Sequence, residues 1–484
     1  MKTTTKTSSS PAAPAGKLDR ALVRMALVLV LGAMAPLLDS TIVNVALHTL
    51  GHAFHAPVAE VQWVTTGYLL SLALAIPTTG WAADRFGAKR VWVFAQLLFL
   101  VGSMLCGTAW NLGTLIGFRL LQGIGGGLML PVMQTLLMRA AGSRDRDKLG
   151  RLMAVITLPA LVAPIFGPVV GGLIIGHASW RLIFYINVPV CLLGALLAWR
   201  LLPADPPNRQ SRLDRTGLLL LSPAVAALLY GLAQVGTTDG FDHTQVVAPL
   251  AAGAVLLAAF LLRAMRTPQP LVDLGLFRVR SFAASSALLF LSGLSMYGSM
   301  LLLPLYYQQV RGASVVAAGL MMAPQGVGSL LARGGGVLTD RLGPRPVLLG
   351  SIALTAAGTI PFIYLGHIDG STETWVLAAA LVVRGMGLSA ANMAVMVGAY
   401  RDLSPEQIPH ASTTTRIAQQ IGASFGTAVL AVVLARQLAA HSAAGQAATA
   451  YGHTFLWALG FTLLSLVPAL ALPRRAEPEQ QPQT

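Results

Sequence analysis

The sequence predicts an all-α polytopic membrane protein with fourteen transmembrane helices and both termini in the cytoplasm. Three observations predict this class. Hydrophobic residues make up 55% of the 484 residues and charged residues only 11%, and the mean hydropathy is +0.68, a balance that excludes an ordinary soluble protein. Fourteen apolar runs are each long enough to cross a bilayer as a helix. Basic residues gather in alternate connections between these runs, as they do in cytoplasmic loops.

The predicted spans follow one another from the N-terminus with short connections. They occupy residues 22–47, 61–80, 91–109, 112–138, 152–176, 182–202, 216–235, 246–265, 282–310, 315–335, 347–365, 375–399, 417–435 and 455–472. Residues 1–20 begin with a stretch rich in Thr, Ser, Pro and Ala, which predicts a disordered cytoplasmic tail. No small-residue cleavage site follows the first run, so we interpret it as a retained span.

The distribution of basic residues predicts the orientation. The termini and the even-numbered connections hold 28 of the 33 Lys and Arg residues, and the odd-numbered connections hold three. The remaining two, Arg119 and Arg384, fall inside spans. The formal net charge of +15 is therefore explained by cytoplasmic loops, and we expect no nucleic-acid partner. Cys106 and Cys191 lie far apart in apolar runs and provide neither a disulfide framework nor a metal site.

An internal repeat divides the chain. The pattern Gly-x-x-x-Asp-Arg-x-Gly occurs at residues 80–87, after the second span, and again at 336–343, after the tenth. Arg119 and Arg384 form a second pair, each followed by glycines. This predicts two six-helix bundles at 21–202 and 282–473, a two-helix insert at 203–281, and a tail at 474–484. Parallel repeats of this kind are typical of transporters.

The two repeated turns are candidate gates. Gly87 allows a tight turn, and Asp84 and Asp340 can face the positive N-terminus of a neighbouring helix. Basic side chains on the two copies are expected to link the bundles on the cytoplasmic side and to separate when that side opens. The predicted gating residues are Gly80, Asp84, Arg85, Gly87, Lys89, Arg90, Asp340, Arg341 and Arg345. Ordinary loop charge is the alternative for the basic residues, but it leaves the repeated Asp and Gly unexplained.

These turns resemble the signature loop of the major facilitator superfamily. Residues 38–47 resemble the first-helix motif of its fourteen-span drug:proton antiporters, the EmrB/QacA type, and residues 119–125 and 167–172 resemble two further motifs. The resemblance implies the major facilitator fold and a conformational switch in the fifth span at Gly167, Pro168, Gly171 and Gly172. The sequence departs from the family at Ala163, where glycine is usual. It also lacks, in residues 315–335, the acidic residue that some cation-exporting relatives carry in the tenth span.

Asp39 is the only one of the 18 carboxylates that falls inside a predicted span. An ionisable group at that depth is costly to bury and is a functional candidate. Counting 1.5 Å per residue places Asp39 about 12 Å and Arg119 about 10 Å from the outer ends of their spans, so the two are level. We interpret this pair as the proton-coupling site, with a static ion pair as the alternative. For Arg384 we expect backbone carbonyls or Gln308 as partners.

Polar and aromatic residues within the spans predict a substrate cavity. They are suited to flat lipophilic cations through stacking and cation–π contacts, although each also has an ordinary role in packing. The predicted lining is Asn44, Trp63, Tyr68, Gln122, Tyr306, Tyr307, Gln325, Asn392, Gln419 and Gln420.

Together these features predict a secondary active multidrug exporter that exchanges lipophilic cations for protons by alternating access. No phosphate-binding loop is present, and no convergent catalytic or metal-binding group is seen, so we expect neither an enzyme nor a cofactor, only the proton gradient. Export of one endogenous metabolite or antibiotic, or uptake by symport, remains open. We expect a monomer in the cell membrane of a bacterium, with the lipid bilayer, protons and small lipophilic molecules as its partners.

Overall fold

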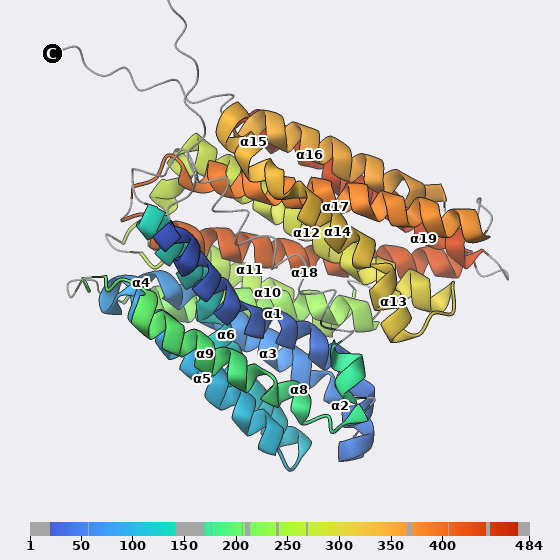
Figure 1. Ribbon diagram of the computed structural model, residues 1–484, viewed down its shortest axis with the longest axis horizontal. Coiled ribbons are helices and arrows are strands. Elements are labelled where there is room, and N and C mark those ends of the chain that lie inside the picture. The colour runs from blue at the N-terminus through green and yellow to red at the C-terminus, as the bar shows by residue number, and fades with distance from the viewer. Residues whose placement is uncertain are drawn as a thin grey trace, which may run out of the picture.

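The structure is a computed structural model. It describes residues 20–56, 58–141, 167, 170–175, 177–205, 207–208, 213–238, 242–267, 270–364, 370–404, 406–441 and 446–472. Across these residues the regular structure is entirely helical, with no β-strand. The chain folds as two helical bundles, seen one above the other in Figure 1.

The N-terminal bundle lies in the lower part of Figure 1. Its elements are α1 (Arg20–Phe54), α2 (Val58–Val61), α3 (Trp63–Ala75), the 3-10 turn η1 (Ile76–Thr78), α4 (Thr79–Phe86), α5 (Ala88–Thr108), α6 (Leu112–Ala141), α8 (Leu182–Tyr185) and α9 (Asn187–Leu201).

Two helices, α10 (Arg215–Thr238) and α11 (Thr244–Ala264), follow the N-terminal bundle. The C-terminal bundle consists of η3 (Leu274–Arg278), α12 (Arg280–Gln309), α13 (Val315–Met321), α14 (Ala323–Leu331), η4 (Ala332–Gly334), α15 (Gly335–Leu342), α16 (Pro344–Thr359), η5 (Ile360–Tyr364), α17 (Gly370–Tyr400), α18 (Ile408–Ala440), α19 (Ala447–Leu464) and α20 (Leu466–Leu470).

Eleven segments of the described chain are long and apolar enough to cross a membrane. Two further predicted spans, 61–80 and 315–335, are helical but broken into shorter pieces near Pro77 and Pro324, since proline removes a backbone donor. The predicted span 152–176 lies mostly outside the described residues. The count of fourteen spans and the location of the termini therefore stay predictions.

The two bundles share a core at only one end. One cluster of buried apolar residues joins α6 and α5 of the first bundle to α12, α17 and α18 of the second, and it includes Leu136, Leu289 and Tyr400. At the opposite end each bundle has its own cluster, around Phe184 in the first and around Phe455 in the second. The bundles are thus packed together at the end that carries Leu136 and Tyr400.

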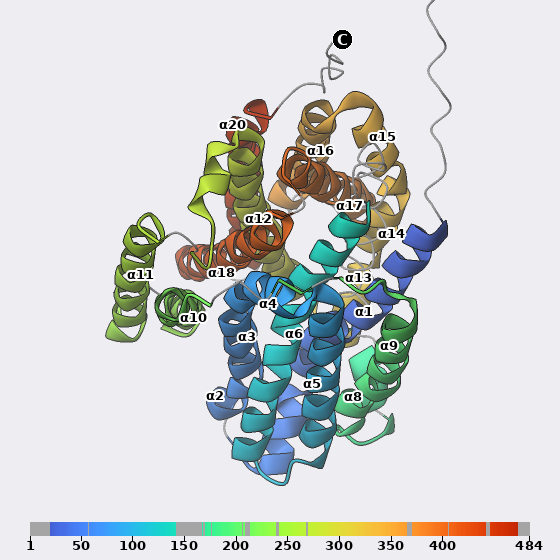
Figure 2. The same cartoon turned by 90° about the vertical axis from the view of Figure 1, so that its left-hand side faces the viewer.

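The insert helix α10 contacts both bundles. It packs against α11, against α3 of the first bundle and against α18 of the second. Figure 2 shows α10 and α11 to one side of the bundles, with α11 farther out. Ser222 Oγ donates to the carbonyl of Leu74 at 2.9 Å, which fixes α10 to the first bundle.

The sequence repeat has a structural counterpart. The helices α4 and α15 each have eight residues, and each ends at a glycine with positive φ, Gly87 at 88° and Gly343 at 85°. A new helix begins directly after each glycine. This backbone conformation strongly favours glycine, which explains why both copies of the motif end in that residue.

Candidate functional site

Asp39 and Arg119 form an ion pair in the interior of the N-terminal bundle. Asp39 lies on α1 and Arg119 on α6, and both side chains have 0% exposure. Arg119 Nη1 donates to Asp39 Oδ2. The sequence predicted that Asp39 and Arg119 lie at the same depth, and the structure shows them in direct contact.

The second carboxylate oxygen of Asp39 is also bonded. Oδ1 accepts from Gln122 Nε2 at 3.1 Å and from Asn187 Nδ2 at 3.0 Å, and both amides also donate to Ser103 Oγ. We did not identify Ser103 and Asn187 as site residues from the sequence. Asn187 carried a signal, because it is a polar side chain within a predicted span. The three donors to Asp39 come from α6 and α9, and Ser103 of α5 accepts from the two amides, so a movement of α1 relative to these helices changes how the carboxylate is bound.

Arg119 also has partners other than Asp39. Its Nε donates to the carbonyl of Val64 at 3.1 Å, and Nη1 donates to Gln122 Oε1 at 2.7 Å. The guanidinium lies 4.1 Å from the centre of the buried Tyr68 ring, a cation–π contact. Two of the predicted cavity residues, Tyr68 and Gln122, therefore belong to the ion-pair network. Arg119 retains bonding partners if Asp39 is neutralised.

The corresponding arginine of the C-terminal bundle is bound differently. Arg384 on α17 is 1% exposed and donates through Nη1 to Gln325 Oε1 of α14 at 2.8 Å. Its Nε has no partner among the described residues. The expectation of Gln308 was wrong, because Arg384 lies between α14 and α16, next to Gly358. Among the described residues no carboxylate forms a salt bridge with Arg384.

Several predicted cavity residues lie elsewhere. Trp63 is 41% exposed and stacks on Tyr230 of α10 with ring centres 5.8 Å apart, so it faces the insert. Tyr306 and Tyr307 pack in the core of the second bundle, where Tyr306 contacts the ring of Tyr451. These aromatic residues therefore contribute to packing in this conformation.

The remaining predicted cavity residues lie on α17 and α18. Asn392 and Gln419 are 8% exposed, and Gln420 is half-buried. The side chain of Asn44 lies outside the described residues.

Arg416 lies outside the predicted span 417–435, but the structure places it inside a helix long and apolar enough to cross a membrane. The helix α18 begins at Ile408, nine residues before the predicted span, because a polar stretch at its start lowers the hydropathy although Thr413 to Thr415 are buried. Arg416 is half-buried, and its Nη1 donates to Gln419 Oε1 at 2.8 Å. Three residues earlier on the same helix, Thr413 bonds to Thr79 of the first bundle. Arg416 thus lies about one helical turn beyond a contact between the two bundles.

The bundles are connected by hydrogen bonds at one end. We call the residues that make these bonds the gate layer: they join Thr79 to Thr413 (2.8 Å), Thr135 to Ser412 (3.0 Å) and Tyr400 to Gln134 (3.1 Å). Gly80 permits this approach, because a Cβ there would lie 3.3 Å from the carbonyl oxygen of Pro409. The gate layer closes the end that carries Gly87 and Gly343.

An ionic cluster continues the gate layer outward. Asp84 Oδ1 accepts from Arg139 Nη2 at 2.7 Å, and Arg139 also contacts Asp205 at 3.3 Å. Asp84 Oδ2 lies 3.5 Å from His410 Nε2 in the first turn of α18. The other ring nitrogen of His410 lies 3.3 Å from the carbonyl of Leu271. Since both ring nitrogens face acceptors, only the protonated imidazolium satisfies both contacts.

The basic residues expected to link the bundles do not do so in this conformation. Lys89 Nζ donates to the carbonyl of Leu202 at 2.6 Å, within its own bundle, because it projects from the start of α5 towards the end of α9. Arg85, Arg90 and Arg341 form no hydrogen bond or ion pair within the described part of the chain. The ionic link between bundles is made instead by Asp84 and His410, and Asp340 is half-buried on α15.

The predicted hinge packs against α1 near the ion pair. A Cβ on Gly167 would overlap Thr41, and one on Gly171 would lie 3.2 Å from Ile42. Gly172 is half-buried, and Pro168 lies outside the described residues. This segment therefore packs closely against α1 two residues from Asp39.

Comparisons with known proteins identify the family. Residues 29–427 match the Major Facilitator Superfamily. The chain belongs to this superfamily. A relative named multidrug resistance protein B homolog, from Mycobacterium tuberculosis, is 40% identical over 423 residues, which are 87% of this chain and 78% of the relative. The multidrug export protein EmrB of Haemophilus influenzae is 35% identical over 312 residues, 64% of this chain and 61% of that protein.

The fold agrees with this assignment. The solved structure of the major facilitator proton:xylose symporter XylE has a TM-score of 0.61 and 15% identity, covering 92% of this chain and 95% of that one. The resemblance to the EmrB type of major facilitator is confirmed, and the fold expectation is confirmed at the level of an all-helical major facilitator. The protein is a multi-pass transporter of the bacterial inner membrane and is not an enzyme.

Proposed function

We propose that this major facilitator is a multidrug exporter that exchanges lipophilic, cationic compounds for protons by alternating access. Its relatives carry the names of multidrug resistance and multidrug export proteins. A charge moved inward across 100 mV releases about 2.3 kcal/mol, and a pH gradient adds to this. The proton gradient alone is therefore sufficient to drive export, and no cofactor is required.

The buried Asp39–Arg119 pair is the observation that carries this proposal. With the gate layer closed, Asp39 is paired with Arg119, shielded from solvent and bonded through both oxygens. Protonation requires Arg119 to leave the carboxylate, and Gln122 and the Val64 carbonyl already hold the guanidinium in place. Movement of α1 relative to α6 then separates the pair and allows Asp39 to take up a proton.

Exchange follows if drug and proton compete for the same carboxylate. A cationic drug is stabilised by the Asp39 carboxylate and loses that attraction when a proton neutralises the carboxylate. Opening of the gate layer admits the drug from the Gly87 end, which we propose is cytoplasmic in a fourteen-span topology with both termini inside. Closure of that end, the state seen here, presents the drug to the opposite side.

The position of Arg416 favours a second candidate function, the export of an acidic compound. Arg416 is a half-buried arginine about one helical turn beyond Thr413, which bonds to the first bundle, and Arg384 adds another buried positive charge. Two such charges would attract a carboxylate and repel a cation. Export of one acidic metabolite or antibiotic is therefore the alternative to cationic drugs, and uptake by symport would use the same proton site in the opposite direction.

Transport by purified protein in liposomes tests the proposal. An imposed pH gradient should drive accumulation of ethidium by the wild-type protein and by Glu60→Gln, a carboxyl-to-amide control at an exposed position. Asp39→Asn should lose gradient-driven accumulation but retain exchange of labelled for unlabelled ethidium, since exchange needs no proton. Accumulation by Asp39→Asn at the wild-type rate would refute proton coupling at this residue, and loss of both activities would indicate a structural role.

A further inference from the structure

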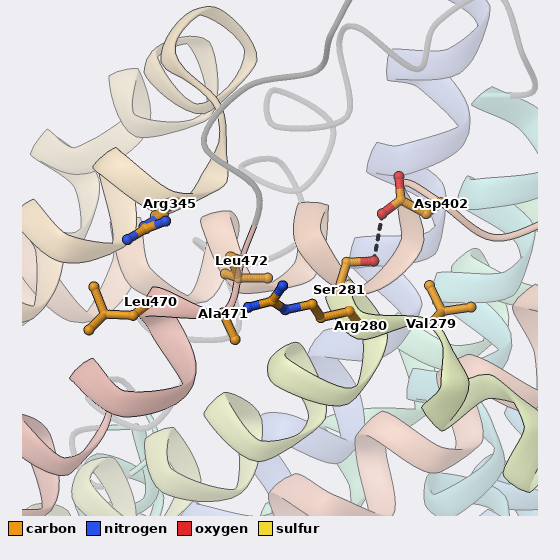
Figure 3. A pocket seen from close by; sticks show the side chains of 8 residues that line it. All are labelled: Val279, Arg280, Ser281, Arg345, Asp402, Leu470, Ala471 and Leu472. Atoms are coloured by element: carbon orange, nitrogen blue, oxygen red, sulfur yellow. Dashed lines mark hydrogen bonds between the residues drawn. The ribbon is translucent and has the colours of Figure 1, made fainter.

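A cavity of about 460 Å³ lies in the C-terminal bundle, at the end that carries Gly343. It is distant in the fold from the Asp39 network and is formed where the first turns of α12 and α16 meet α20. The residues that line it are Val279, Arg280, Ser281, Arg345, Asp402, Leu470, Ala471 and Leu472 (Figure 3). All of them lie at the end that the basic residues predict to be cytoplasmic.

The polar wall of the cavity has an excess of positive charge. Figure 3 shows Arg280 extending across the cavity beside Ala471, with Arg345 beyond it above Leu470. Within the described residues neither arginine forms a hydrogen bond or ion pair. Asp402 is on the far side from Arg345 and accepts from Ser281 Oγ at 2.6 Å. Two guanidinium groups without partners and one engaged carboxylate favour an anion.

The backbone adds to this preference. Arg280 is the first residue of α12, and Arg345 is the second residue of α16. Neither helix N-terminus is capped by a side chain, since Val279 and Gly343 precede them. Apart from Pro344, which has no N–H, these uncapped first turns supply free N–H groups and a partial positive charge, and guanidinium groups bind phosphate oxygens in pairs.

The opposite wall is apolar and is formed by Leu470, Ala471 and Leu472. Leu470 is 52% exposed, and Val467, one turn earlier on α20, is 68% exposed, so the apolar surface extends along α20. A soluble anion has no use for such a wall, whereas acyl chains would lie along it. We infer that this cavity binds the phosphodiester headgroup of an acidic phospholipid, with Arg280 and Arg345 as its ligands.

Lipid retention measured by native mass spectrometry tests the inference. Purified full-length protein would be titrated with phosphatidylglycerol or, separately, phosphatidylethanolamine. The wild type should bind one phosphatidylglycerol in clear preference to phosphatidylethanolamine, and Arg280→Ala/Arg345→Ala should weaken the binding of phosphatidylglycerol about tenfold or more. Arg278→Ala/Arg333→Ala removes two exposed arginines outside the cavity and should leave it unchanged.

Two further comparisons keep the outcome decisive. Asp402→Asn removes the opposing charge and should strengthen phosphatidylglycerol binding, which a variant that merely misfolds would not do. Equal loss in both double variants would overturn the inference in favour of general surface attraction. Displacement of the lipid by millimolar inorganic phosphate would also overturn it, since the cavity would then be a site for a soluble anion.

Discussion

The Asp39–Arg119 pair allows a quantitative test by a double-mutant cycle. Three variants are needed: Asp39→Asn, Arg119→Gln and the combination. Breaking a buried pair by removing one partner typically costs about 3–5 kcal/mol, because the other charge stays buried. Both side chains here have 0% exposure, so each single variant should lower the free energy of unfolding by about that amount. The combined variant should recover about 2–3 kcal/mol of the sum, since neither charge is left alone.

The assay is unfolding in mixed micelles as SDS is titrated, followed by tryptophan fluorescence. Glu60→Gln, which changes an exposed carboxyl group, should alter the unfolding free energy by less than about 0.5 kcal/mol. If the costs of the two single variants simply add in the double variant, to within about 0.5 kcal/mol, the two charges are not coupled. That result would refute the reasoning that the pair is the ionised centre of the bundle.

Four other predictions concern the gate layer and the proposed substrate-binding region. Gly87→Ala should destabilise the protein by about 1–2 kcal/mol in the same assay, because φ at this residue is 88°; an unchanged value would contradict the turn geometry. Raising the pH from 5.5 to 8 should increase labelling of a Thr413→Cys reporter as the His410 contact with its carboxylate is lost, and His410→Gln should abolish this pH dependence. Arg416→Gln should improve the apparent affinity for cationic drugs about fivefold or more, and a loss of cation transport would argue against a repulsive role. Trp63→Ala should change ethidium affinity less than about twofold, since its ring stacks on the insert helix, and a tenfold loss would restore it to the cavity.

Spacing and hydropathy predicted the ion pair and the turns for physical reasons. A single carboxylate in an apolar helix has few ways to be satisfied, so Asp39 pointed to Arg119. The φ values of Gly87 and Gly343 are positive in both copies, which is why the repeat was visible in the sequence. Hydropathy failed at α18, where Arg416 and buried threonines lie inside a helix that starts nine residues before the predicted span.

Partners that depend on packing could not be predicted. Asn187 is a polar side chain within a predicted span, but Asp39 is 148 positions away in the sequence, and the segment around Asn187 does not indicate which residue it contacts. The same holds for Trp63, whose position on α3 suits a cavity until α10 is placed beside it. His410 appeared as a loop residue, and its role at the gate depends on the approach of α18 to Asp84.

Proton release on drug binding tests the central claim most directly. Purified protein in weakly buffered detergent solution at pH 7 would be mixed with ethidium while a pH-sensitive dye is monitored. We expect the wild type and Glu60→Gln to release protons on binding ethidium, and Asp39→Asn to bind ethidium without releasing any. Proton release by Asp39→Asn equal to that of the wild type would contradict the claim that drug and proton compete at Asp39.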